Sequence, residues 1–172
     1  EKRVEGYRNF ATKLWNATRF CQSNGIGASA TLAAPKAELA VNRWIIGEVV
    51  ETLAKLDQAI ADLRFDAMAD AIYHFTWGTF CDWYLELSKP VLTDPASSEA
   101  AQRGTRQTLV QTLETLLRLL HPLMPFITEE IWQRVAPLAG ACGESVMTQR
   151  WPDPSLFPVD DDAEAELGWI QG

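Results

Sequence analysis

Near its start, the chain carries a helical face whose side chains could bind a nucleic acid. At 100° per residue, one stripe gathers cations, an amide and a hydroxyl: Arg8, Thr12, Asn16 and Arg19. Further polar and aromatic residues flank it: Asn9, Lys13 and Phe20 on one side, Trp15 on the other. Cations bind phosphates, amides bind base edges, and rings stack on bases. The strip therefore predicts an RNA-binding surface; the alternative is a solvated face whose rings pack on neighbouring helices.

Two carboxylates four residues apart, Asp82 and Glu86, are the next groups that could do chemistry. With His74 they could perform acid–base work or hold a metal ion. The paired Glu-x-x-His pattern of metal-binding bundles is absent, however, and no further ligand stands at helical spacing. We therefore expect a buried or half-buried pair that forms ion pairs with an arginine of another helix: Arg43, Arg106 or Arg118.

The histidines and cysteines predict no catalytic residue and no metal site. His74 faces away from the apolar stripe, and His121 stands at a helix end, where a cation can satisfy free carbonyl groups. The cysteines are odd in number and far apart, which favours a reducing cytosol: Cys21, Cys81 and Cys142. Glycine-rich phosphate loops and the GxSxG and HExxH motifs are also absent.

The net charge of −8 argues against nucleic acid until its distribution is considered. Residues 1–24 hold five basic and two acidic residues, a local charge of +3, whereas six acidic and no basic residues follow position 152. A local basic face can still bind RNA, because salt screens charges beyond roughly 8–10 Å. The sequence has no run of about 18 uncharged apolar residues, so we expect no membrane span.

The elements that must position these residues are helices. Apolar residues recur at steps of three and four over five segments: about 1–23, 36–63, 65–89, 99–120 and 126–136. The inward stripe of the first segment comprises Tyr7, Phe10, Leu14, Ala17 and Cys21. The second comprises Ile46, Val49, Leu53, Leu56, Ile60 and Leu63, and the third Met68, Ile72, Phe75, Thr79, Trp83 and Leu87.

Long helices joined by short loops predict an all-α fold, an antiparallel bundle of four to five helices over residues 1–152. The third helix is expected to stop before Pro90. A short extended piece is expected at Val146–Trp151. Residues 153–172 are expected to form an acidic linker and the start of a further helix.

Three strings resemble the anticodon-binding domain of class I aminoacyl-tRNA synthetases. They are RNFATKLWNATRF at 8–20, FCDWYLELSKP at 80–90 and LRLLHPLMPFITEEIW at 117–132, with a weaker match at 42–45. The resemblance spans residues 1 to about 152 in order. The strings Cys-Asp-Trp-Tyr and Leu-His-Pro-Leu-Met-Pro-Phe are similar to the valine enzymes rather than to the isoleucine or leucine enzymes.

The resemblance implies a domain that binds the anticodon stem-loop of a valine-accepting tRNA. It implies tRNA contacts by Arg8, Asn9, Lys13, Asn16, Arg19 and Phe20, and a scaffold role for Asp82, Glu86 and Trp132. Such enzymes are cytoplasmic and use ATP and magnesium on a separate catalytic domain with His-Ile-Gly-His and Lys-Met-Ser-Lys-Ser type motifs. Both motifs are absent here, so we expect a fragment that is inactive alone and lacks its catalytic domain and C-terminal arm. The alternative is a scaffold domain of an isoleucine or leucine enzyme without autonomous RNA binding.

Overall fold

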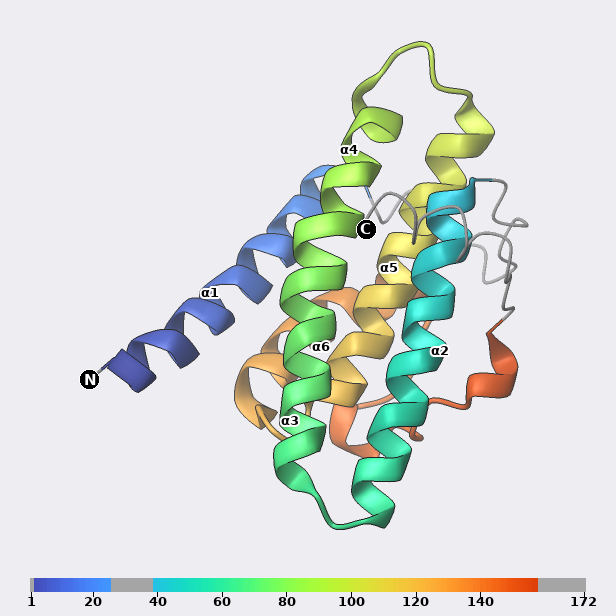
Figure 1. Cartoon of the computed structure of the whole chain (residues 1–172). Helices are drawn as coiled ribbons and strands as arrows, with labels where there is room; N and C mark the ends of the chain where they lie inside the picture. Colours follow the sequence, from blue (N-terminus) through green and yellow to red (C-terminus); the bar gives the residue numbers. More distant parts are fainter. Residues whose placement is uncertain (1, 26–38, 158–172) are drawn as a thin grey trace, which may run out of the picture.

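A bundle of long helices forms the described part of the chain, residues 2–25 and 39–157 of the computed structural model (Figure 1). The elements are α1 (Lys2–Ser23), α2 (Ala40–Ala61), α3 (Phe65–His74), the π-helix η1 (Phe75–Tyr84), α4 (Leu85–Thr93), α5 (Glu99–Leu120) and α6 (Pro125–Ala139). Two 3₁₀ turns follow, η2 (Val146–Thr148) and η3 (Pro154–Leu156). The all-α prediction is confirmed, and α5 has its predicted bounds.

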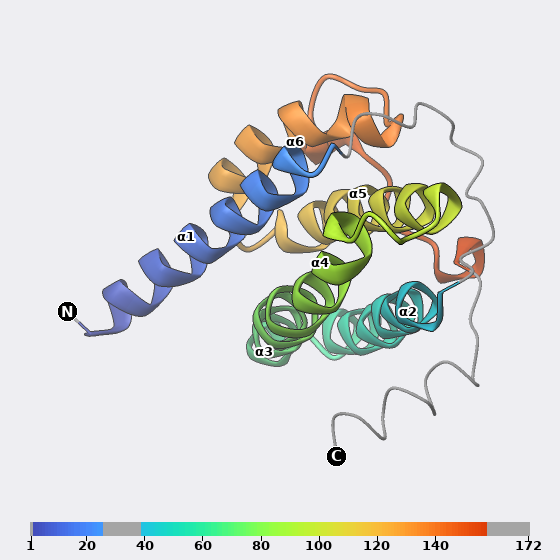
Figure 2. The same cartoon turned by 90° about the horizontal axis from the view of Figure 1, so that it is seen from above.

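Helix α5 is the centre of the bundle. It contacts α1, α2, α4 and α6, and nearly every residue from Gly104 to Leu120 is buried. Seen along the bundle, α2 and the α3–η1–α4 rod lie on one side of α5, and α6 lies on another (Figure 2). A helix that is covered on all sides must be apolar or internally bonded around its whole circumference. Two buried threonines of α5 are bonded in this way: the Thr108 hydroxyl donates to the Gly104 carbonyl at 2.8 Å, and the Thr105 hydroxyl accepts from the Asn42 amide at 3.0 Å.

The third predicted helix is one continuous rod in which η1 changes the register. Up to Phe75 the buried residues are those predicted, but beyond it Phe80, Tyr84 and Ser88 are buried. The expected stripe through Thr79, Trp83 and Leu87 is not the fully buried face: Trp83 is 38% exposed, Thr79 is half-buried, and Leu87 is half-buried against the core. A π-helix bonds each residue to the fifth along the chain rather than the fourth, so its turns take up extra residues and the inward face moves one position along the sequence.

The expected end of this helix before Pro90 is also wrong, because α4 continues to Thr93. Proline lacks a backbone N–H, but the last turn gains other bonds. The Asp94 N–H donates to the Pro90 carbonyl at 2.9 Å, and the Thr93 hydroxyl donates to the Lys89 carbonyl at 2.8 Å.

Three further expectations fail at the ends of elements. Tyr7 is 71% exposed, because the N-terminal part of α1 projects beyond the other helices (Figures 1 and 2). Ile60 and Leu63 are exposed, because α2 ends at Ala61 and Leu63 lies in the turn that follows. Val146–Thr148 is a 3₁₀ turn instead of an extended piece, and the Ser145 hydroxyl accepts from the Met147 N–H. The first expected residues of the second helix, 36–38, lie outside the described residues.

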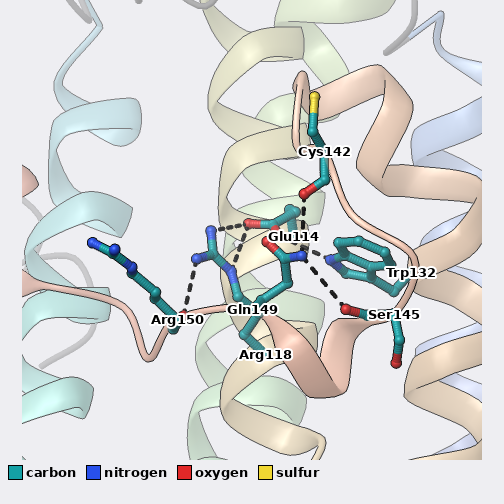
Figure 3. A network of polar contacts seen from close by, with 7 residues as sticks. All are labelled: Glu114, Arg118, Trp132, Cys142, Ser145, Gln149 and Arg150. Atoms are coloured by element: carbon teal, nitrogen blue, oxygen red, sulfur yellow. Dashed lines mark hydrogen bonds and ion pairs between the residues drawn. The ribbon is translucent and has the colours of Figure 1, made fainter.

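A buried carboxylate connects α5 to α6 and to the segment that follows (Figure 3). Glu114 accepts from the indole N–H of Trp132 at 2.9 Å and from the guanidinium of Arg118 at 3.1 Å. Arg118 also donates to the Arg150 carbonyl at 3.3 Å, and Gln149 donates to the Cys142 carbonyl at 3.1 Å. Because each of these donors has a carboxylate or carbonyl acceptor, the contacts hold α6 and the segment from Cys142 to Arg150 against α5.

Replacing Glu114 by Gln should lower the free energy of unfolding by roughly 2 kcal/mol. A Gln side chain has one oxygen and one NH₂ group, so either Trp132 or Arg118 would face a donor instead of an acceptor. Urea unfolding followed by circular dichroism measures this loss. The matched control is Glu130→Gln, which breaks the exposed ion pair to Arg134 at the same i,i+4 spacing and should cost less than about 0.5 kcal/mol. Equal losses in the two variants would contradict the prediction.

Candidate nucleic-acid interface

Helix α1 is held on the bundle by one apolar stripe. It rests on η1, α5 and α6 through buried side chains: Phe10, Leu14, Ala17 and Cys21. Burial of this stripe leaves the opposite stripe facing solvent along the whole helix. The local sequence forms a helix because apolar residues recur at three- and four-residue steps from Phe10 to Cys21, and the chain leaves the helix at Gly25, whose φ of 74° is left-handed and whose N–H bonds to the Gln22 carbonyl at 3.2 Å.

Four of the six predicted contact residues lie on this outer stripe or, in the case of Asn9, directly beside it. Arg8, Asn9, Asn16 and Arg19 are all exposed. Within the described part of the chain, no ion pair engages either guanidinium. Thr12, on the same stripe, donates its hydroxyl to the Arg8 carbonyl at 2.9 Å. The outer face thus presents two cations and two amides with nothing from the described residues covering them.

Lys13, the fifth predicted residue, is half-buried at the edge of α1 and points toward η1. Its ammonium group forms an ion pair with Asp82, and it lies 4.0 Å from the centroid of the Trp77 ring. A cation held by a carboxylate and an aromatic face is less available to a phosphate than a solvated one. Lys13 therefore joins α1 to η1 in this structure.

The expected arginine partners of Asp82 and Glu86 are wrong. Asp82 pairs with Lys13, and Glu86 pairs with Lys89 at 2.5 Å. Both carboxylates are exposed rather than buried, because the π register rotates this part of the rod toward α1 and solvent. The candidate arginines have other contacts: Arg106 donates to the Asn24 carbonyl at 2.8 Å, and Arg118 pairs with Glu114.

Phe20, the sixth predicted residue, is half-buried and packs against the core. The Lys89 ammonium lies 5.7 Å from its ring centroid. On the other flank, the Trp15 ring is half-buried with the Arg134 guanidinium 5.3 Å from its centroid. Each flanking ring thus has a cation of another helix over it, and both cations also pair with a carboxylate, Lys89 with Glu86 and Arg134 with Glu130.

The histidines and cysteines near α1 have structural surroundings. His121 bonds through Nδ1 to the Thr128 hydroxyl at 2.8 Å, which replaces the expected contact with free helix carbonyls. His74 is exposed as predicted and lies 3.3 Å from Asp70. Burial raises the pKa of the Cys21 thiol to about 12, with the nearby Cys81 adding to the shift. Both buried thiols are thus protonated near neutral pH.

Two searches of the described residues concern other kinds of site. No group of three or more His, Cys, Asp or Glu side chains in residues 2–25 and 39–157 is arranged to hold a metal ion. No helix in these ranges is long and apolar enough to cross a bilayer.

Sequence patterns did not predict a cluster of rings that lies between α1 and the α3–η1–α4 rod. Phe10 stacks on Tyr73, with centroids 5.2 Å apart, and both rings lie near Trp77. Tyr73 and Trp77 are four residues apart and so share one helix face, a signal that was available in the sequence. Nothing in the sequence indicated that this face would meet α1, because the two helices that form the contact are far apart in the chain.

Comparison with known proteins places this fold in a family. Residues 42–171 match the family described as the anticodon-binding domain of tRNA ligase. Over 170 residues and 99% of its length, the chain is 54% identical to a valine–tRNA ligase of Rhizorhabdus wittichii. It is 44% identical over 169 residues to that of Coxiella burnetii and 45% identical over 174 residues to that of Zymomonas mobilis.

The chain spans 18–19% of the length of these curated relatives. Helix α1 precedes the range matched by the family, but it lies within the similarity to the relatives, which covers 98–99% of the chain. The all-α bundle, the family match over most of the chain and the similarity along its whole length agree. The chain belongs to the family of anticodon-binding domains of tRNA ligases.

Proposed function

We propose that this chain is the anticodon-binding domain of a valine–tRNA ligase and that it binds the anticodon stem-loop of a valine-accepting tRNA. The similarity of 44–54% to three proteins named valine–tRNA ligase, over nearly the whole chain, carries the proposal. The whole ligase would attach valine to tRNA, using ATP and magnesium on a catalytic domain beyond this sequence. We assign neither cofactor to residues of this chain.

The outer face of α1 is the RNA-binding surface in this proposal. Arg8 and Arg19 would bind phosphates or base edges, and Asn9 and Asn16 would hydrogen-bond to bases. The exposed part of the Phe20 ring would stack on a base beside Lys89. This face supports the proposal because it gathers cations and amides on a helix that belongs to the most basic segment of an acidic chain.

Lys13 would act as a positioning residue, since it links α1 to η1 through Asp82 and Trp77. Its role is to fix the orientation of the helix that carries the contact residues. This assignment differs from a direct phosphate contact, and the two roles give opposite results when Asp82 is changed.

The domain organisation is part of the same proposal. Residues 1–152 would be the anticodon-binding bundle, and residues 153–172 an acidic linker leading to a C-terminal arm, with the catalytic domain as the other partner within the ligase. Asp153 caps the η3 turn through its bond from the Ser155 N–H at 2.9 Å, and residues 158–172 lie outside the described residues. The three cysteines are unpaired, which supports a cytoplasmic location.

Replacing Arg19 by Gln should weaken stem-loop binding roughly five- to tenfold and lower the salt dependence of the binding constant by about one phosphate contact. The reason is that one exposed cation is removed without breaking any internal ion pair of the described residues. Fluorescence anisotropy with a labelled anticodon stem-loop, at several salt concentrations, gives both quantities. The control is Lys55→Gln on α2, which removes the same charge away from α1 and should leave both unchanged. Equal effects of the two variants would show that only net charge matters.

Replacing Lys13 by Gln should weaken binding about two- to fivefold but leave the salt dependence unchanged, because the ammonium group contacts Asp82 rather than RNA. Replacing Asp82 by Asn should also weaken binding. If Lys13 bound a phosphate directly, Asp82→Asn would release it and strengthen binding, so the sign separates the two roles. Labelling of Cys21 and Cys81 by a thiol reagent should become faster in both variants, since both thiols are buried near this contact.

The amino acid attached to tRNA tests the ligase assignment itself. The full-length ligase carrying this chain should charge valine-accepting tRNA with valine, and the double variant Arg8→Gln, Arg19→Gln should raise the KM for tRNA several-fold with little change in the KM for valine. Charging with isoleucine or leucine would overturn the valine assignment. Unchanged charging kinetics in the double variant would favour the alternative, a helical scaffold with no RNA contact on α1.

A further inference from the structure

The cluster of aromatic rings between α1 and the α3–η1–α4 rod has the geometry of a stacking surface. The rings of Phe10, Tyr73 and Trp77 are nearly parallel, with interplanar angles of 20–26° between each pair. Their centroids are 5.2 Å apart for Phe10 and Tyr73, 5.9 Å for Tyr73 and Trp77, and 6.4 Å for Phe10 and Trp77. Offset parallel rings at these separations are favourable, and a further flat ring can continue such an arrangement.

The open part of this cluster belongs to Tyr73. Phe10 is 5% exposed and closes the inner side, and Trp77 is half-buried with the Lys13 ammonium over its ring. Tyr73 is 43% exposed. Its ring contacts those of Phe10 and Trp77 and, at an interplanar angle of 82°, that of His74, so it would lose little side-chain entropy on binding a partner.

The surroundings of Tyr73 favour an anionic polymer over an apolar protein surface. Lys13 lies beside the cluster, and Asn9, one turn earlier on the same side of α1, is exposed. Two of the nearby carboxylates are paired with cations: Asp82 with Lys13, and Asp66 with Arg64 at 2.6 Å. Asp70 lies 3.3 Å from His74, which carries a charge only when it is protonated. The pairing of Asp82 and Asp66 lowers the negative charge that would repel a phosphate backbone.

We propose that Tyr73 is a stacking site for an unpaired nucleobase of the RNA bound along α1. The site rests on the proposed function and extends the RNA surface from α1 onto α3. It specifies the ligand as an unpaired base, because only a base outside a duplex offers a free face to a ring. A paired stem would present phosphates and sugars instead.

The test measures binding of an anticodon stem-loop in which single loop bases are replaced in turn by the fluorescent base 2-aminopurine. Stacking on Tyr73 should quench one of these probes in the wild-type chain. Tyr73→Leu, which keeps an apolar side chain but removes the ring, should abolish that quenching and weaken binding roughly tenfold. Tyr73→Phe keeps the ring and should behave like the wild type within about twofold.

The matched control is Phe65→Leu, which removes an exposed ring at the other end of the same helix and should leave quenching and affinity unchanged. Circular dichroism and the urea midpoint check that each variant keeps the fold. If Tyr73→Leu binds and quenches like the wild type while Arg19→Gln weakens binding, the stacking site is wrong and the proposed function stands. If the wild-type chain binds no stem-loop even at low salt, the proposed function and the stacking site both fail.

Discussion

The wide turns of η1 set the constraint on which the arrangement around α1 depends. This π-helical segment contacts α1, α2, α3 and α4, so its register decides which side chains face each of them. In a regular α-helix the stripe through Phe75 would continue to Thr79 and Trp83, but the π register buries Phe80 and Tyr84 instead. Buried Tyr84 donates to the Asn42 side chain at 2.8 Å and thereby ties η1 to α2. Asp82 and Trp77 then lie where Lys13 of α1 can reach both.

The strings that carry the family resemblance are mostly scaffold in this structure. In the closing string, Trp132 bonds to buried Glu114, and His121 bonds to Thr128, which bonds in turn to the Met124 carbonyl at 2.8 Å. These bonds shape the α5–α6 connection around two prolines that interrupt the helix. Glu129 links α6 to the segment that follows it. Burial alone would raise the pKa of Glu129, but hydrogen bonds from Gln133, Ser145 and the Val146 N–H lower it. Residues that identify a family thus need not touch its ligand.

An acidic chain can carry the proposed RNA-binding face because charge acts locally. The outer stripe of α1 carries Arg8 and Arg19 at the surface. On the α3–η1–α4 rod, Asp82 pairs with Lys13 and Glu86 with Lys89. Screening in salt limits the influence of distant carboxylates to about one Debye length. The proposed RNA-binding face offers few cations for phosphates, so we expect this chain by itself to bind RNA with modest affinity.

The sequence by itself determined the helices, the all-α class, the inward stripe of α1 from Phe10 to Cys21 and, by its strings, the family. Periodicity gives these results because each depends on residues close together in the chain. It also picked the exposed Arg8, Asn9, Asn16 and Arg19, since the outer face of a helix is fixed once the inner face is known. Their contact with RNA stays a prediction.

Only the tertiary structure decided the partners of Lys13, the stacking of Phe10 on Tyr73, and the exposure of Tyr7. Each depends on where α1 lies against a rod some 70 residues further along the chain, and on a π register that apolar spacing does not encode. A stripe shows which face of a helix is apolar. It does not show how far the neighbouring helix extends to cover that face, or which side chain it presents there.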